Sequence, residues 1–329
     1  MKNAEKFFAP LLALLLALSL ALSLAGCAGE GPAAPRGAPH RLCFVAKSTD
    51  TEFWQAAFAG ARAASSEYNA ELTICGPETE EDYETQNEYI AEAVKNGAEA
   101  LIFSAISYTE NAPAIDAAAE AGVKIVVIDS DVDSQRVSAR IGTDNVQAGR
   151  MAAAAAMDAD YDTLTVGIVN YALGSRNGQE REQGFREALE KDPRTGEIYT
   201  INVLTTPEAA MAGAVKLLAE HPEINVLAAF NEPLAVGAAM AVDALGLAGK
   251  IRMVGFDTNV KCIDLMRAGA VSALIVQNPY AMGYLGVETA WQLLEGGEET
   301  EGWLDTATTM IDPGNMFSPE SQKALFPFG

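Results

Sequence analysis

The chain has 329 residues, of which 49% are hydrophobic, and it carries 45 acidic against 22 basic side chains. The resulting formal charge of −23 disfavours nucleic acid and anionic membrane surfaces as partners, because binding phosphate requires clustered lysines and arginines. At roughly 150 residues per domain, a chain of this length is expected to form two globular units, each large enough to bury a core.

The N-terminus has the composition of a targeting segment followed by a tether. Lys2 and Lys6 precede an almost wholly apolar run, which ends in Leu24-Ala25-Gly26-Cys27, a motif that resembles the bacterial lipobox. We therefore expect residues 1–26 to be a lipoprotein signal peptide and Cys27 to be acylated as the first mature residue. Segment 27–40 is rich in Gly, Ala and Pro, as is typical of a flexible tether. An uncleaved anchor helix is the alternative, and either interpretation places the folded part outside the cytoplasm.

From Arg41 onward, strand patterns alternate with helix patterns. The first half predicts strands at 42–46, 72–75, 100–103, 124–128 and 139–142, and helices at 53–68, 83–95 and 112–121. The second half begins with a helix at Asp144-Asn145 and predicts strands at 164–169, 198–203, 226–230, 252–255 and 273–276, with helices at 179–190, 207–220, 233–245, 262–267 and 283–294. This alternation implies parallel strands with right-handed crossovers. The predicted fold class is therefore α/β, with two similar doubly wound parallel-sheet lobes.

The cysteines and histidines suggest no metal site. Cys43 and Cys75 fall in adjacent predicted strands, so a disulfide between them is conceivable. Neighbouring strands seldom give suitable disulfide geometry, which favours two small buried thiols. Cys262 has no partner under either interpretation. Because no Cys/His spacing matches a metal site, we expect neither metal nor cofactor.

Polar side chains follow the carboxyl ends of several predicted strands, where open α/β sheets bind ligands. These side chains are Asp129, Asn231, Asp257 and Gln277. Phe53 and Trp54 open the helix after the first strand, and Arg181 lies early in a helix of the second half. Aromatic rings cover the C–H face of a sugar, whereas carboxylates, amides and a guanidinium bridge its hydroxyls. Together these residues predict a carbohydrate site in a cleft, with Asp129 on one lip and Asn145 on the other.

These segments together resemble the bacterial substrate-binding proteins of the periplasmic-binding-protein type 1 family, and they are similar to ribose-binding proteins. The resemblance runs from Arg41 to about Ile311 and rests on VVID, GTDN, QEREQGF, FNEPLAVGA, VGFD and VQNPYAMG. It implies a three-segment hinge near Gly142-Thr143, Gln277-Asn278 and Thr306-Ala307. The N-terminal lobe would then comprise 41–143 plus 278–306, and the C-terminal lobe 144–277 plus 307–329.

The same resemblance implies the ligand contacts. Carried over by position, they are Phe53, Trp54, Asp129, Asn145, Arg181, Asn231, Asp257 and Gln277. Thr51 and Ser130 are further candidates, and both depart from the ribose-binding pattern, which has Asn and Arg at these positions. These departures disfavour ribose itself.

Lys47 follows the first predicted strand on the cleft side and is a further candidate contact. It would bring a cation toward the pocket, which would suit an acidic or phosphorylated substrate. A buried lysine is more often neutralised by a neighbouring carboxylate. We therefore favour an ion pair with one of the nearby acids, Asp50, Glu52 or Asp129.

The resemblance implies a monomeric, lipid-anchored, extracytoplasmic protein that captures a small carbohydrate (a pentose, hexose, polyol or derivative) and delivers it to the permease of an ABC importer. The alternative is a ligand-sensing module for a chemoreceptor or a sensor kinase. A transcriptional repressor of the same fold is disfavoured, because a signal sequence replaces the DNA-binding helices. No enzyme is expected, since G-x-S-x-G, a P-loop and a triad histidine are missing from the sequence, although carboxylate pairs leave a glycosidase open.

Overall fold

The computed structural model describes residues 38–299 and 302–326. The predicted signal peptide, the lipidation site at Cys27 and most of the tether lie outside these ranges. Within them, no helix combines the length and the apolar character needed to cross a bilayer. From His40 onward the chain forms one structural unit, which contains two sheets.

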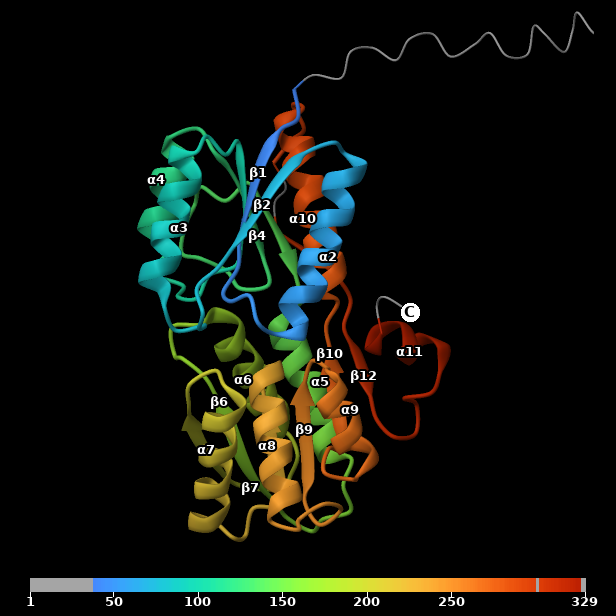
Figure 1. Ribbon diagram of the computed structural model, residues 1–329. Helices are drawn as coiled ribbons and strands as arrows, with labels where there is room; N and C mark the ends of the chain where they lie inside the picture. Colours follow the sequence, from blue (N-terminus) through green and yellow to red (C-terminus); the bar gives the residue numbers. More distant parts are fainter. Residues whose placement is uncertain (1–37, 300–301, 327–329) are drawn as a thin grey trace, which may run out of the picture. The chain divides into compact units, whose positions relative to one another are not determined.

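The N-lobe is built on a six-stranded parallel sheet in the order β11-β5-β4-β3-β1-β2 (Figure 1). Its strands are β1 (Arg41–Val45), β2 (Glu71–Cys75), β3 (Ala100–Phe103), β4 (Lys124–Ile128), β5 (Ala139–Gly142) and β11 (Trp303–Asp305). Its helices are α2 (Glu52–Glu67), α3 (Tyr83–Lys95), α4 (Ala112–Glu120) and α10 (Pro279–Leu294). Side chains of the central strands alternate between two cores, one shared with α2 and α10 and one with α3 and α4. Helices therefore cover both faces of this sheet, which explains why its central strands are apolar throughout.

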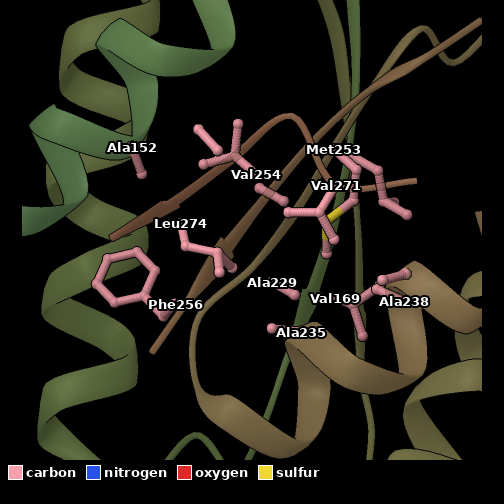
Figure 2. Close-up of a cluster of buried hydrophobic side chains, with 14 of the residues drawn as sticks. Ala152, Val169, Ala229, Ala235, Ala238, Met253, Val254, Phe256, Val271 and Leu274 are labelled. Atoms are coloured by element: carbon pink, nitrogen blue, oxygen red, sulfur yellow. The ribbon is translucent and has the colours of Figure 1, made fainter. Parts of the chain in front are cut away.

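The C-lobe repeats this plan in the order β12-β10-β9-β8-β6-β7, with β12 antiparallel to β10. Its strands are β6 (Leu164–Asn170), β7 (Thr195–Asn202), β8 (Val226–Ala229), β9 (Arg252–Phe256), β10 (Ala273–Val276) and β12 (Thr309–Ile311). Its helices are α5 (Asn145–Met157), α6 (Arg176–Leu189), α7 (Pro207–Glu220), α8 (Glu232–Ala244), α9 (Val260–Arg267) and α11 (Pro319–Leu325). Figure 2 shows part of its core, in which Ala235 of α8 and Leu274 of β10 both belong to the buried cluster. The small alanines let these helices lie close to the sheet.

Three crossings join the lobes. The chain passes from β5 of the N-lobe into α5, which packs on β9 and β10 of the C-lobe. It returns from β10 into α10, which packs on β3 and β4 of the N-lobe, and it crosses again between β11 and β12. The predicted fold class, two doubly wound α/β lobes joined by a three-segment hinge, is confirmed.

The principal predicted strands and helices are present, and the differences lie at their ends and near the C-terminus. The helix predicted at 179–190 begins three residues earlier, at Arg176. The strands β11 and β12 and the helix α11 were not predicted. β11 and β12 are three residues long, which is too short for an alternating pattern to emerge, and all three residues of β11 are exposed.

Each lobe has a helix pair, next to a crossing, that packs with its backbones in contact. In the N-lobe, a methyl group on Gly60 of α2 or on Gly283 of α10 would overlap a backbone carbonyl oxygen of the facing helix. Gly149 of α5 and Gly184 of α6 make the equivalent contact in the C-lobe. Glycine is required at such close approaches because no other residue lacks a Cβ atom. In each lobe, the helix that arrives through a crossing is therefore packed firmly against another helix of its own lobe.

The three cysteine thiols among the described residues, at Cys43, Cys75 and Cys262, are free. Cys43 on β1 and Cys75 on β2 have their Sγ atoms 3.9 Å apart, and Cys262 is buried in the C-lobe. Cys43 pairs with Thr73 in the β1–β2 ladder, so the two cysteines are offset by two residues. This offset explains why the thiols approach each other without the geometry of a disulfide.

Candidate functional site

Asp129 and Asp257 occupy equivalent positions in the two lobes. Each directly follows a strand, β4 or β9, and each has a positive φ, of 57° and 61°. Each donates its backbone N–H to a carbonyl oxygen of the next strand, Ile141 at 3.1 Å and Ile275 at 2.9 Å. Asp tolerates this left-handed conformation better than most residues. The bend places both carboxylates in the wall of a cavity between the lobes.

Arg181 of α6 is the cation at the centre of this cavity, and it is 1% exposed. Its Nη2 atom lies 3.8 Å from Oδ1 of Asp129. Its N–H groups donate to Oδ1 of Asn145 at 2.8 Å, to the carbonyl oxygen of Phe230 at 2.7 Å and to Oε1 of Gln277 at 2.7 Å. The guanidinium is thus held rigidly by neutral acceptors on three sides. It can stabilise a carboxylate or a ligand oxygen without reorganising.

Gln277 connects Arg181 to Asp257. While its Oε1 atom accepts from Arg181, its Nε2 atom donates to Oδ1 of Asp257 at 2.9 Å. Burial raises the pKa of Asp257 to about 6, although Arg181 and the Gln277 hydrogen bond act in the opposite direction. Among the described residues, Gln277 is the donor to this buried carboxylate, through its side chain and its backbone. A carboxylate can accept more hydrogen bonds than these, so a ligand hydroxyl is a suitable further donor.

Lys47 is buried in the N-lobe wall, and its predicted partners were wrong. Its Nζ atom pairs with Glu80 at 2.9 Å instead of Asp50, Glu52 or Asp129, and it also donates to Ser175 across the cleft at 3.3 Å. Burial alone would lower the pKa of Lys47, but Glu80, Tyr171 and Asp129 together outweigh burial and the net shift is upward. The lysine is therefore charged and already neutralised, which leaves no free cation here for an acidic ligand.

The two adjacent aromatic residues of α2 have different environments. Trp54 is 1% exposed, belongs to the core beneath α2, and donates from Nε1 to Glu80 at 2.9 Å. Phe53 is half-buried, and its ring meets that of Trp54 edge-on with centroids 5.1 Å apart. Both line the cavity, as does Thr51, whose hydroxyl caps α2 by accepting from the Trp54 N–H. Phe53 is the freer of the two rings to stack on a ligand.

The remaining predicted residues have less direct roles. Asn231 caps α8 through its side-chain oxygen and lines the cavity. Asn145 opens α5 but lies outside the cavity wall, so it acts through Arg181. Ser130 is buried, lies outside the wall, and its hydroxyl has no hydrogen-bond partner among the described residues.

Sequence reasoning missed several polar residues of the wall, namely Glu80, Tyr171, Asn177 and Glu232. Tyr171 directly follows β6, but the strand was predicted to end one residue early, at 169, so the rule that singled out Asp129 and Asp257 would have pointed to Asn170. Burial raises the pKa of Tyr171 to about 12, which keeps its hydroxyl protonated as it donates to Asn177 at 2.8 Å. Asn177 was missed because the helix was predicted to begin at residue 179, whereas α6 begins at Arg176.

Several hydrogen bonds close the lobes onto the cavity. Asn177 of the C-lobe donates to Oδ1 of Asp129 in the N-lobe at 3.0 Å, and Ser104 donates to the other oxygen at 2.9 Å. From the C-lobe, Glu232 accepts from the backbone N–H of Phe53 at 2.9 Å. These contacts correspond to a closed arrangement of the lobes.

The cavity between the lobes has a volume of about 20 Å³ in this structure. That is room for about one water molecule, so a ligand of monosaccharide size requires the walls of the cavity to move apart. A larger groove of about 690 Å³ lies beside the hinge, between α2 and α11, and shares Phe53, Asp257 and Gln277 with the smaller cavity. Its lining is mainly apolar and does not include Arg181 or Asp129, so the polar groups that can bridge hydroxyls converge on the smaller cavity.

The comparisons with known proteins agree with this geometry. Residues 42–299 match the family model described as "Periplasmic binding protein domain". The D-ribose/D-allose-binding protein of Pseudomonas aeruginosa is 29% identical over 284 residues, which cover 82% of this chain and 88% of that protein. A carbohydrate transporter solute-binding protein of Agrobacterium radiobacter, solved in complex with D-arabinose, has a TM-score of 0.84 at 26% identity and covers 88% of this chain and 99% of its own.

A chain of the XylFII–LytSN complex has a TM-score of 0.77 at 26% identity and covers 84% of this chain and 98% of its own. The family model alone spans well over half of the sequence. The chain therefore belongs to the periplasmic binding protein family.

Proposed function

We propose that this protein is an extracytoplasmic solute receptor that closes on one neutral monosaccharide-sized carbohydrate and delivers it to an ABC importer. The main support is that three charged residues, Asp129, Arg181 and Asp257, line the same cavity, with Arg181 paired to Asp129. The partly exposed Phe53 ring lines this cavity too. Carboxylates and a guanidinium bridge adjacent hydroxyls, and the ring covers a C–H face. The names of the relatives that bind ribose, allose or arabinose support the same class.

A neutral sugar is favoured over an acidic one because of the charges in the wall. Lys47 is paired with Glu80, and Arg181 is held beside Asp129. Asp257 and Glu232 add two carboxylates that have only neutral donors within hydrogen-bonding distance. A second anion in this cavity would have to overcome their repulsion.

The test is a thermal-shift panel of neutral pentoses, hexoses and polyols, with amino acids and sugar phosphates as comparison classes. A ligand at 100 times its Kd adds about 2.7 kcal/mol to stability, so a true ligand gives a clear rise in melting temperature. Isothermal titration then gives the affinity. Tight binding of an amino acid with no response to any neutral sugar would contradict the proposal.

The lipid anchor is a separate part of the proposal, supported by the lipobox at Cys27. The variant Cys27→Ala is expected to move the protein from the membrane fraction to the soluble fraction. Cys262→Ala, a buried thiol in the C-lobe, is the matched control and should leave the distribution unchanged. Retention of the Cys27 variant in carbonate-washed membranes would refute the anchor.

A sensing role is the second candidate, favoured by the likeness to a chain of the XylFII–LytSN complex. In that role the closed form would bind a partner protein instead of a permease. The two roles separate in a deletion strain: loss of uptake of the identified sugar supports delivery, whereas intact uptake with a lost transcriptional response to the sugar supports sensing.

A further inference from the structure

Glu232 makes a contact between the lobes that the ligand site does not explain. Its carboxylate is 5% exposed and lies at the start of α8 in the C-lobe. Oε2 accepts from the backbone N–H of Phe53 in the N-lobe at 2.9 Å, and Oε1 accepts from Nδ2 of Asn259 at 2.9 Å. Both oxygens of a buried carboxylate are thus used by the protein.

The donor on the N-lobe side belongs to the first turn of a helix. The first N–H groups of an α-helix have no partner within the helix. In α2, the Thr51 hydroxyl accepts from Trp54 at 3.3 Å, whereas the Phe53 N–H has its partner in the opposite lobe. The positive end of the helix dipole also favours a carboxylate at this place. Glu232 therefore completes the cap of α2 from across the cleft.

A second carboxylate makes the reverse contact. Glu81 of the N-lobe accepts from the backbone N–H of Thr205 at 2.6 Å, and Thr205 immediately precedes Thr206, the N-cap residue of α7 in the C-lobe. Each lobe thus sends one carboxylate to a backbone N–H near the start of a helix in the other lobe. Separating the lobes would break both hydrogen bonds.

We propose that Glu232 is a closure latch, which strengthens sugar binding by capping α2 only when the lobes are closed, and that Glu81 supports it from the opposite lobe. This inference rests on the proposed function, since it assigns a role in the affinity of the same site. As a latch, Glu232 contributes equally to every sugar that fits the cavity. It does not decide which sugar binds.

The contribution of Glu232 to closure of the lobes should decrease as pH rises. Burial raises the pKa of Glu232 to about 7 in the closed form, opposed by the hydrogen bonds from Asn259 and Phe53 and assisted by the nearby Asp257 and Glu52. A solvated glutamate has a pKa of about 4.3, so closing takes up a proton between these values. Closure is most favourable at low pH and becomes less favourable as pH rises through about 7. Asp257, with a pKa raised to about 6, acts in the same direction at slightly lower pH.

Two substitutions separate the hydrogen bond from the titration. Glu232→Ala removes the acceptor and should weaken every sugar that binds by about tenfold without changing their rank order. Glu232→Gln keeps an oxygen acceptor but cannot titrate, so its affinity should fall less than that of the wild type between pH 5 and 7, where the wild-type carboxyl group loses its proton. Glu84→Gln, an exposed carboxylate in the first turn of α3, is the matched control and should keep the wild-type pH profile.

A readout that needs no ligand keeps the latch testable if no sugar is found. Hydrogen exchange of the Phe53 amide, followed by NMR, should be slowed in the wild type and accelerated in Glu232→Ala. If that amide is protected but the panel of neutral sugars fails, the capping of α2 by Glu232 is supported and the proposed function is contradicted. Unchanged exchange in Glu232→Ala, or a changed rank order among sugars, would overturn the latch.

Discussion

Asp129 and Asp257 have the same backbone geometry and different surroundings. Both lie in the left-handed region after a strand, and both project into the same cavity. Among the described residues, two side chains donate to the oxygens of Asp129, Asn177 and Ser104, whereas Gln277 alone donates to Asp257. The N-lobe carboxylate is thus already engaged in holding the lobes together. The C-lobe carboxylate is a buried charge whose donors come from a single residue.

The largest effect is expected from removing the cation that the two carboxylates share. Arg181→Ala leaves Asn145, Gln277 and Asp129 without their charged donor in a buried site, which should lower the free energy of unfolding by about 3–5 kcal/mol. Chemical denaturation measures the change. Arg186→Ala is the control on the same helix, because Arg186 is partly exposed and its ion pair with Glu182 should contribute about 1 kcal/mol or less. Equal losses in both variants would contradict the central role of Arg181.

The two aspartates should respond in opposite directions to neutralisation. At pH 8, Asp129→Asn replaces one of the two accepting oxygens by an NH2 group, which leaves Asn177 or Ser104 without its acceptor, and should destabilise the protein by about 1–3 kcal/mol. Asp257→Asn removes a buried charge whose pKa is raised to about 6, and it should stabilise the unliganded protein by about 1–2 kcal/mol. Calorimetry should show weaker sugar binding for Asp257→Asn despite the gain in stability. A loss of stability in both variants would remove the proposed difference between the lobes.

The pH dependence of stability sharpens the comparison further. Asp257 and Glu232 have folded-state pKa values raised to about 6 and about 7, so folding takes up protons above the ordinary carboxylate range. Their contribution is most favourable below about pH 4 and is lost as pH rises through 6 and 7. Urea unfolding should therefore give lower stability at pH 8 than at pH 5, by about 1–2 kcal/mol. The double variant Asp257→Asn, Glu232→Gln should show a smaller difference.

The smallest effect is expected in the aromatic wall. Trp54→Phe keeps a ring in the core but loses the hydrogen bond to Glu80, which should cost about 0.5–1.5 kcal/mol. A change in tryptophan emission on sugar binding should disappear in this variant, since Trp54 lines the cavity and Trp291 and Trp303 do not. Trp291→Phe, which should keep the emission change, is the control. An emission change that survives Trp54→Phe would place the reporting ring elsewhere.

The fold could be predicted because short stretches of sequence determine its strands and helices. Uninterrupted apolar runs such as Lys124–Ile128 coincide with the observed strand β4, and parallel strands place their ends at one edge of the sheet. For this reason Asp129 and Asp257 could be selected from the sequence alone. Their position at the cavity required only the strand boundaries to be correct.

The rest of the wall depends on contacts between distant segments. Glu80 lies in a loop with no periodic pattern, and its partners Lys47 and Trp54 are 33 and 26 residues away. Glu232 has the pattern of an ordinary helix start, where a carboxylate is favoured by the dipole of its own helix. Nothing local indicates that it also caps a helix in the other lobe. Such pairings follow from the arrangement of the lobes, which no local pattern encodes.

The backbone contact between α2 and α10 has a mechanical consequence. α10 begins at Pro279, immediately after the second crossing, and α2 carries Phe53 in its first turn (Figure 1). Because Gly60 and Gly283 bring the two backbones together, there is no compressible layer of side chains at that point to absorb a rotation. We therefore expect α2 and α10 to move as one rigid body about the second crossing, so a rotation there would also displace the Phe53 ring.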